Sequence, residues 1–244
     1  MFQYGYLVKL FGIDPNAASE YVMTQQQSVI YLVCLGVCLI ISYLLGSINS
    51  GIIVSKILYE DDVREHGSGN AGLTNVYRTY NTKATVLTLL GDIVKVFISL
   101  FITAFFFGFL YKTGLSYQPL CYLSGLFCVI GHIKPIFYKF KGGKGVLCAS
   151  ATILLLAPFV FLCLLLVFVS LVAMTKYISV GSVAIAFFLP FTIQANMNIL
   201  GAANPSITGL CALIGIIIII CHRANIKRLS HGEENKFHFK KKEN

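Results

Sequence analysis

The sequence predicts an all-α polytopic membrane protein with seven transmembrane helices. Of its 244 residues, 57% are hydrophobic and only 12% are charged, which is too little polar surface to cover a soluble core of this size. Several apolar runs reach the length of about 18 residues that indicates a membrane span. The distribution of basic residues then decides the number of spans and their orientation.

The apolar runs give seven candidate spans. The boundary at Pro158 decides the number, because a proline ends or kinks a helix. Without a break there, residues 146–175 would form one long helix and the count would be six. The expected spans are 28–45 with a helical extension to 58, then 84–110, 120–138, 146–158, 159–175, 178–200 and 207–221.

Seven spans with the N-terminus outside place all but three of the 19 lysines and arginines on the cytoplasmic side, as basic loops prefer. Lys9 and Lys112 fall outside, and Lys95 lies within a span. A six-span arrangement with both termini inside would scatter the basic loops over both faces. The cytoplasmic set is Lys56, Arg64, Arg78, Lys83, Lys134, Lys139, Lys141, Lys144, Lys176, Arg223, Lys227, Arg228, Lys236, Lys240, Lys241 and Lys242.

We expect three regions along the chain: an extracytoplasmic N-terminal extension (1–27), a seven-span membrane domain (28–229) and a basic cytoplasmic tail (230–244). The extension has no uninterrupted apolar stretch before a cleavage site, so a cleavable signal peptide is not expected. The eight cysteines lie within or beside apolar runs and form no C-x-x-C pair. We therefore interpret them as small apolar side chains.

A glycine-rich segment, residues 66–78 (HGSGNAGLTNVYR), separates the first and second expected spans. Gly67, Gly69 and Gly72 allow sharp turns and let backbone N–H groups approach an anion. Asn75 and Arg78 are three residues apart and would share a helical face, and arginine binds phosphate with two parallel hydrogen bonds. The segment is predicted to bind phosphate; the alternative is a flexible interhelical loop.

A second segment, residues 131–145 (GHIKPIFYKFKGGKG), leads into the fourth expected span. It is not a P-loop, because Gly145 and Val146 follow Lys144 and no strand precedes it. A glycine turn at a helix N-terminus, with Lys141 and Lys144 beside it, would still attract an anion. The alternative is a basic loop that contacts anionic lipid, which requires charge but not paired glycines.

A third segment, residues 222–234 (HRANIKRLSHGEE), follows the last expected span. His222, Asn225 and Arg228 would share a helical face. Histidine can donate or accept a proton near neutral pH. The alternative is a basic flank that stops membrane transfer, which also explains residues 240–242.

Smaller polar features lie inside the expected spans. Asp92 and Lys95 are three residues apart and are expected to pair in the bundle interior, because ionisable groups are costly in a membrane; the alternative is that they line a substrate site. Ser179 and Ser182 begin the sixth span on one face. Residues 46–51 (GSINSG) indicate close helix packing in the first span rather than an unwound turn.

In order and spacing, the three segments resemble the motifs of the PlsY family, the integral membrane acyl-phosphate:glycerol-3-phosphate acyltransferases of bacteria. The resemblance covers about residues 43–237 and rests on residues 67–78, 131–146 and 222–233. It implies seven spans in the bacterial cell membrane, an active site that faces the cytoplasm, and acyl transfer from acyl-phosphate to the 1-hydroxyl of glycerol 3-phosphate. Lysophosphatidic acid and phosphate would be the products. No cofactor, metal or nucleic-acid partner is expected, and the oligomeric state is left open.

Matching these motifs residue by residue implies two groups of site residues. The expected catalytic residues are Ser68, Arg78, Lys144, Ser182, His222 and Asn225. The expected substrate- or phosphate-binding residues are Gly67, Gly69, Asn70, Asn75, Lys141, Gly142, Gly143, Gly145 and Ser179. Departures from the family's usual residues, at 46–51, Leu73 and Cys221, bear on pocket shape and acyl preference more than on the reaction.

Three other classes of protein remain to be weighed. An organic-phosphate transporter is the main non-enzyme alternative, but the sequence shows no internal repeat and its polar groups collect near the interface rather than the midplane. An enzyme like the CDP-alcohol phosphotransferases would need several metal-binding aspartates, and Asp92 is the only carboxylate within the spans. A lipid-anchoring scaffold would explain the basic flanks but not residues 66–78. The H-x-x-x-x-D signature of acyl-CoA-type enzymes is absent.

Overall fold

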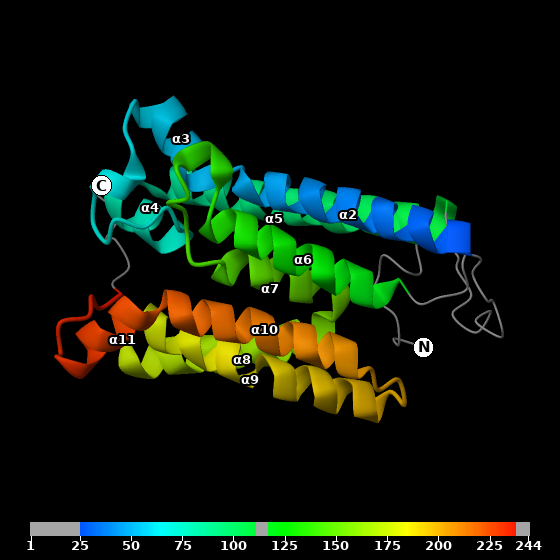
Figure 1. Ribbon diagram of the computed structural model, residues 1–244. Coiled ribbons are helices and arrows are strands. Elements are labelled where there is room, and N and C mark those ends of the chain that lie inside the picture. Colours follow the sequence, from blue (N-terminus) through cyan, green and yellow to red (C-terminus); the bar gives the residue numbers. More distant parts are fainter. Residues whose placement is uncertain (1–24, 111–116, 238–244) are drawn as a thin grey trace. The chain divides into compact units, whose positions relative to one another are not determined.

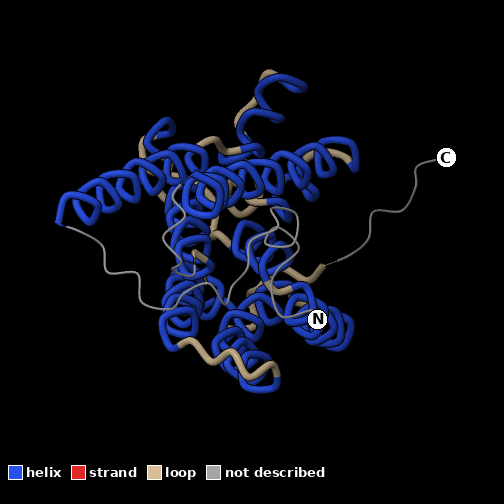
Figure 2. The backbone as a smooth tube through the Cα atoms, turned by 90° about the vertical axis from the view of Figure 1, so that its right-hand side faces the viewer, coloured by secondary structure: helices blue, strands red, loops and turns tan. Residues whose placement is uncertain are grey.

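The computed structural model describes residues 25–110 and 117–237, and within these ranges it consists of helices and loops with no strand (Figure 2). The chain divides into two compact units, Met1–Pro158 and Phe159–Asn244 (Figure 1). Most of the expected N-terminal extension, the expected external Lys9 and Lys112, and the end of the basic tail lie outside the described residues.

The all-helical membrane architecture is confirmed, but not every expected crossing has a helix of spanning length. Among the residues that the structure describes, five helical segments are long and apolar enough to cross a membrane, and a sixth is a helix pair bent by 53°. Helix α7 has only 11 residues (Val146–Leu156) and is therefore about 16 Å long, whereas the hydrocarbon core is about 30 Å thick. The five are Gln25–Tyr59, Thr82–Gly108, Gln118–Tyr138, Pro158–Thr175 and Ile178–Ile199, and the bent pair is Pro205–Cys221 with Arg223–Ser230.

The first expected span is built from two helices, α2 (Gln25–Ser47) and α3 (Ser50–Tyr59). Asn49 caps α3 by accepting a hydrogen bond from the N–H of Ile52 at 3.2 Å. Gly46 lies so close to the backbone of Cys128 in α6 that a Cβ would not fit. Residues 46–51 therefore provide both close packing and a helix break, of which the sequence favoured only the first.

Helix α5 (Thr82–Ala104) is the centre of unit 1, because it contacts α2, α3, α4, α6 and α7. Its chain continues as a π-helical segment, Phe105–Leu110. The short helix α4 (Leu73–Thr79) precedes it and carries the end of the first glycine-rich segment.

Prolines set the ends of the following helices. Helix α6 (Gln118–Ile133) stops earlier than expected because Lys134 precedes Pro135, and the residue before a proline is disfavoured in helical conformation. Helix α7 ends at Leu156 and α8 begins at Pro158. The expected break at Pro158 is therefore confirmed.

A buried charged cluster occupies the interior of unit 1. The Nζ of Lys95 lies 2.8 Å from Oδ1 of Asp92, as the sequence predicts, and 3.0 Å from Nδ1 of His132. It also donates to the carbonyl oxygens of Gly46 (3.2 Å) and Ile48 (2.9 Å) at the break between α2 and α3. Lys95 thereby connects α5, α6 and the helix break.

As far as Phe237, unit 2 has four helices, and two glycines lie at their contacts. Gly181 of α9 lies against the side chain of Phe168 in α8, and Gly215 of α10 lies against the carbonyl of Ala186 in α9. Beyond α11 the chain folds back, and the N–H of Phe237 donates to the carbonyl of Lys176 at 2.7 Å. The helices are α8 (Pro158–Thr175), α9 (Ile178–Ile199), α10 (Pro205–Cys221) and α11 (Arg223–Ser230).

Replacing Lys95 with methionine should destabilise the protein by about 3–5 kcal/mol, because it leaves the buried carboxylate of Asp92 without its cation. Thermal unfolding in detergent, followed with a thiol-reactive fluorophore, would measure this through buried cysteines such as Cys128 and Cys148. The double variant Asp92→Asn/Lys95→Met should recover part of the loss. The control Lys83→Met changes an exposed lysine at the start of α5. An unchanged unfolding midpoint in Lys95→Met would contradict the assigned role.

Candidate active site

The first glycine-rich segment folds around the side chain of Asn75. Oδ1 of Asn75 accepts a hydrogen bond from the N–H of Ser68 at 3.0 Å, and Nδ2 donates to the carbonyls of Val63 and His66, both at 2.9 Å. Gly67, at φ +56°, lies against this carboxamide and leaves no room for a Cβ. Asn75 is buried, so it shapes the loop from inside and both of its N–H groups bond within the loop.

The other polar residues of the segment differ in exposure. Ser68 is exposed, and Asn70 is half-buried with its Oδ1 accepting a hydrogen bond from the N–H of Gly72 at 2.9 Å. Arg78 is half-buried in the last turn of α4. Asn75 and Arg78 therefore lie on one short helix, as the sequence predicts, but Asn75 is committed to the loop backbone.

Asp61 holds the base of this loop, a role that the sequence did not indicate. Its Oδ2 accepts a hydrogen bond from the Tyr80 hydroxyl at 2.7 Å and lies 2.8 Å from Nε2 of His66. The hydrogen bonds from Tyr80 and His66 lower the pKa of Asp61. Burial, together with the neighbouring carboxylate, raises the pKa of Tyr80 to about 12. The carboxylate is therefore ionised, and the phenol protonated, across the neutral pH range.

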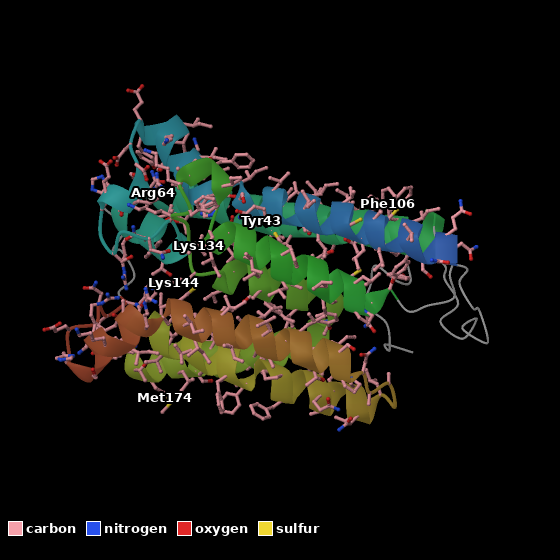
Figure 3. The ribbon with its side chains drawn as sticks, in the orientation of Figure 1. Tyr43, Arg64, Phe106, Lys134, Lys144 and Met174 are labelled. Carbon is pink, nitrogen blue, oxygen red and sulfur yellow. The ribbon has the colours of Figure 1, made fainter. Side chains whose placement is uncertain are left out.

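Arg64 joins the first glycine-rich segment to the second. Its guanidinium binds Asp62 through two contacts, Nε to Oδ1 at 2.9 Å and Nη2 to Oδ2 at 2.6 Å, and this partner lowers the pKa of Asp62. Its Nη1 donates to the carbonyls of Tyr138 (3.2 Å) and Lys141 (3.1 Å). Figure 3 shows Arg64 and Lys144 at the same end of unit 1. Sequence reasoning had treated Arg64 only as a cytoplasmic charge.

In the second segment, the paired glycines rest on His132. The N–H of Gly143 donates to the carbonyl of His132 at 3.0 Å. Neither Gly142 nor Gly143 could carry a Cβ, because the carbonyl and the Nε2 of His132 occupy that space. Gly145, at φ +82°, then starts α7. The turn that carries Lys144 is therefore seated on a histidine that is itself bonded to Lys95.

The cluster around His132 also brings together atoms that could hold a metal ion. Among the described residues, one such group exists: Asp92, His132 and Cys148 place their ligand atoms within 4.8 Å of one another. The ammonium of Lys95 already contacts Asp92 and His132. A metal ion would have to displace this resident cation.

In unit 2, Glu234 organises the third segment. Its Oε1 accepts a hydrogen bond from Nδ2 of Asn225 at 2.7 Å, and its Oε2 accepts one from Nε of Arg228 at 2.8 Å. Asn225 and Arg228 therefore share a face of α11, as the sequence predicts. Burial alone would raise the pKa of Glu234, but Asn225, the neighbouring hydroxyl of Ser179 and Arg228 outweigh it and lower the pKa. Sequence reasoning did not assign Glu234.

His222 lies buried at the junction of α10 and α11, with Nδ1 2.8 Å from the carbonyl oxygen of Ile218. Because a carbonyl only accepts, Nδ1 carries the proton of the neutral ring and Nε2 carries the lone pair. Ser179 and Ser182 are buried in the first turns of α9, and the Ser182 hydroxyl donates to the carbonyl of Ile178 at 3.0 Å.

The candidate residues thus form two groups. In unit 1, Arg64, which lies just before the first segment, bonds the second segment. In unit 2, Glu234 bonds Asn225 and Arg228 within the third segment. The expected catalytic residues are divided between the units: Ser68, Arg78 and Lys144 in unit 1, and Ser182, His222 and Asn225 in unit 2.

Comparisons with known proteins agree with the sequence motifs. The chain matches the family described as "Glycerol-3-phosphate acyltransferase" over residues 36–232. The glycerol-3-phosphate acyltransferase of Finegoldia magna is 37% identical over 219 residues, which cover 85% of this chain and 96% of that protein. The corresponding protein of Trichlorobacter lovleyi is 40% identical over 196 residues, 80% of this chain and 94% of that protein.

A solved structure has the same fold. The crystal structure of PlsY, an integral membrane glycerol 3-phosphate acyltransferase, in its glycerol 3-phosphate form, matches with a TM-score of 0.71 and 32% identity over 84% of this chain and 96% of that chain. The family match spans all of the first two motifs and the third as far as Gly232. This chain therefore belongs to the glycerol-3-phosphate acyltransferase family of integral membrane PlsY proteins.

Proposed function

We propose that this chain transfers an acyl group from acyl-phosphate to the 1-hydroxyl of glycerol 3-phosphate, forming lysophosphatidic acid and phosphate in phospholipid synthesis. The chain is a glycerol-3-phosphate acyltransferase by family, and its relatives do not favour the transporter alternative. The observation that supports the proposal is the presence of the three family motifs, in order, with the matched region covering the first two and the third as far as Gly232.

We infer seven membrane crossings with the N-terminus outside and the active site at the cytoplasmic face of a bacterial cell membrane. The positions of the lysines and arginines support this orientation. Within each unit, the motif segments gather at one end of the helices (Figure 1). The fourth crossing would use the short α7, which is about 14 Å shorter than the hydrocarbon core, so the bilayer would have to thin around it. The proposed membrane domain is 28–229, flanked by the extension 1–27 and the tail 230–244.

Both proposed substrates carry a phosphate, and the motifs offer different donors. We assign the turn Gly142–Gly145, with Lys144 and Lys141, to one phosphate, because glycine turns at helix N-termini bind anions. Arg78, Ser68 and Asn70 contribute to the phosphate region generally, with Gly67 and Gly69 shaping their loop. Asn75 acts on this region through the loop backbone that it bonds.

The proposed reaction needs little activation of the nucleophile, because acyl-phosphate is already a reactive anhydride. The 1-hydroxyl attacks the acyl carbonyl, the C–O bond to phosphate breaks, and phosphate leaves. Holding both reactants in attack geometry can supply about 7–11 kcal/mol. Asn225 would stabilise the oxyanion, or Ser182 would do so if its hydroxyl turned away from the carbonyl of Ile178. The hydroxyl proton passes to Nε2 of His222 or to a substrate phosphate oxygen.

The donor is tested directly with purified protein. Glycerol 3-phosphate supplied with acyl-phosphate should give lysophosphatidic acid, whereas glycerol 3-phosphate supplied with acyl-CoA should give none, because the chain lacks the acyl-CoA-type signature. Mass spectrometry of the extracted lipid measures the product. Turnover with acyl-CoA alone would refute the proposed donor, and phosphate-dependent flux without lipid product would favour a transporter.

Arg78→Ala and Lys144→Ala should each lower activity at least about tenfold, the loss expected when a charged hydrogen bond worth roughly 1.5–3 kcal/mol is removed. Both proteins should still insert into membranes. Arg78→Lys keeps the charge but loses the paired donors, so it should be only partly active. Lys83→Ala is the control for an exposed lysine in the same unit. Near-normal turnover in either alanine variant would remove that residue from the site.

No covalent acyl-enzyme should form, because no nucleophile with a base and an orienting partner is assembled among the candidate residues. Radiolabelled acyl-phosphate, quenched during turnover, should leave no label on the protein after denaturation. Label retained on a serine or cysteine would show a two-step mechanism in place of the direct transfer.

A further inference from the structure

A turn within the second segment exposes apolar side chains among lysines. The exposed fractions are 48% for Ile136, 59% for Phe137 and 51% for Phe140, and Lys134 and Lys139 are exposed beside them. We call residues 134–140 the basic aromatic turn.

The turn holds these side chains outward in a fixed conformation. Lys139 and Phe140 both adopt left-handed backbone conformations, at φ +55° and +57°, which non-glycine residues disfavour. The carbonyl of Pro135 accepts hydrogen bonds from the N–H groups of Tyr138 (3.2 Å) and Phe140 (2.9 Å). The Arg64 guanidinium fixes the carbonyl of Tyr138 from the other side. The backbone conformation of the turn therefore fixes these side chains in an exposed position.

Hydrogen bonds to α2 set the depth of the turn in the membrane. Helix α2 has 23 residues and is about 35 Å long, slightly more than the hydrocarbon thickness of about 30 Å. Near its C-terminal end, the Tyr43 hydroxyl donates to the carbonyl of Lys134 at 2.8 Å, and Oγ of Ser47 accepts a hydrogen bond from the N–H of Ile136 at 3.4 Å. If α2 spans the hydrocarbon, these bonds would place the turn near the level of the lipid headgroups.

The neighbouring end of α3 also exposes an apolar and a basic side chain. Lys56 lies 6.0 Å from the ring centroid of Tyr138, and Ile57 is 72% exposed. The nearby carboxylates of Asp61 and Asp62 are engaged by His66, Tyr80 and Arg64. Glu60 and Glu65 are the exposed acids of this stretch, against three lysines, Lys56, Lys134 and Lys139. The surface is therefore apolar and net basic.

We propose that the basic aromatic turn and the end of α3 form a binding surface for anionic phospholipids. The rings of Phe137 and Phe140 enter the boundary between headgroups and acyl chains, while Lys56, Lys134 and Lys139 reach the lipid phosphates. Opposite charge and headgroup depth select anionic lipid as the occupant. The surface anchors the loop that continues to Lys144, and its occupancy does not depend on the acyl donor or on turnover.

The chain contains no tryptophan, so Phe137→Trp creates a single fluorescent reporter within the turn. The protein would be reconstituted in phosphatidylcholine vesicles with bromine atoms placed either near the headgroup or near the chain terminus. The reporter should be quenched more strongly by the shallow bromines. The control Phe97→Trp, an exposed position well inside α5, should be quenched more strongly by the deep ones. Water-like emission without quenching, or a deep profile at position 137, would overturn the placement.

A second comparison tests the preference for anionic lipid. Brominated phosphatidylglycerol should quench Phe137→Trp with an apparent binding constant on the order of fivefold higher per contributing lysine than brominated phosphatidylcholine. Adding Lys134→Gln and Lys139→Gln should reduce this preference about 25-fold, leave the contribution of Lys56, and keep the shallow quenching. Their unfolding midpoint should match that of the parent.

Three results would refute the lipid surface. Equal quenching by the two lipids would show that charge plays no part. Loss of the preference on adding inorganic phosphate at constant ionic strength would identify a soluble anion as the ligand. Blue-shifted emission that no brominated lipid quenches would show that protein, such as a second copy of the chain, covers the turn.

Discussion

The position of one buried ammonium group constrains the whole of unit 1. Lys95 has three N–H donors and lies within hydrogen-bonding or ion-pairing distance of four acceptors, which belong to Asp92, His132 and the carbonyls of Gly46 and Ile48. A buried lysine in a helical bundle is tolerated only when its charge is matched in this way. Because His132 in turn seats the glycine turn before Lys144, a buried interaction at the ends of α2 and α6 supports the geometry of the proposed phosphate site.

In each motif, a buried or half-buried polar side chain holds the segment in place through hydrogen bonds. Asn75 bonds the first loop from inside, Arg64 fastens the second loop to it, and Glu234 fixes two side chains of the third. The side chains of these residues form hydrogen bonds within the protein and thereby position the groups that would bind a phosphate. Glycine loops alone would be too mobile for this purpose, because glycine gives up much backbone entropy on ordering. Buried polar anchors give these loops a defined shape.

Local sequence patterns predicted the features that depend on neighbours in the chain. Apolar length indicated most spans, Pro158 indicated a helix end, and spacings of three predicted both the Asp92–Lys95 pair and the shared face of Asn225 and Arg228. The bonds from Arg64 to the second motif and from Lys95 to His132 join residues 74 and 37 positions apart. Such contacts arise from tertiary packing, which no local periodicity encodes. Likewise, the sequence does not predict that the carbonyls of Gly46 and Ile48 accept hydrogen bonds from Lys95, because this contact forms only in the folded protein.

A phosphate-bearing substrate with a fatty chain makes two demands on a protein: the phosphate requires cations and N–H groups near water, whereas the chain requires apolar surroundings. Helices with their polar loops gathered at one end satisfy both demands with a single boundary. Because the proposed donor is already activated, the activation free energy that remains is mainly the cost of bringing the two substrates together in the correct orientation. Rigid loops held by buried charges address that barrier directly. A site of this kind therefore needs accurate placement of modest groups more than it needs a strong nucleophile.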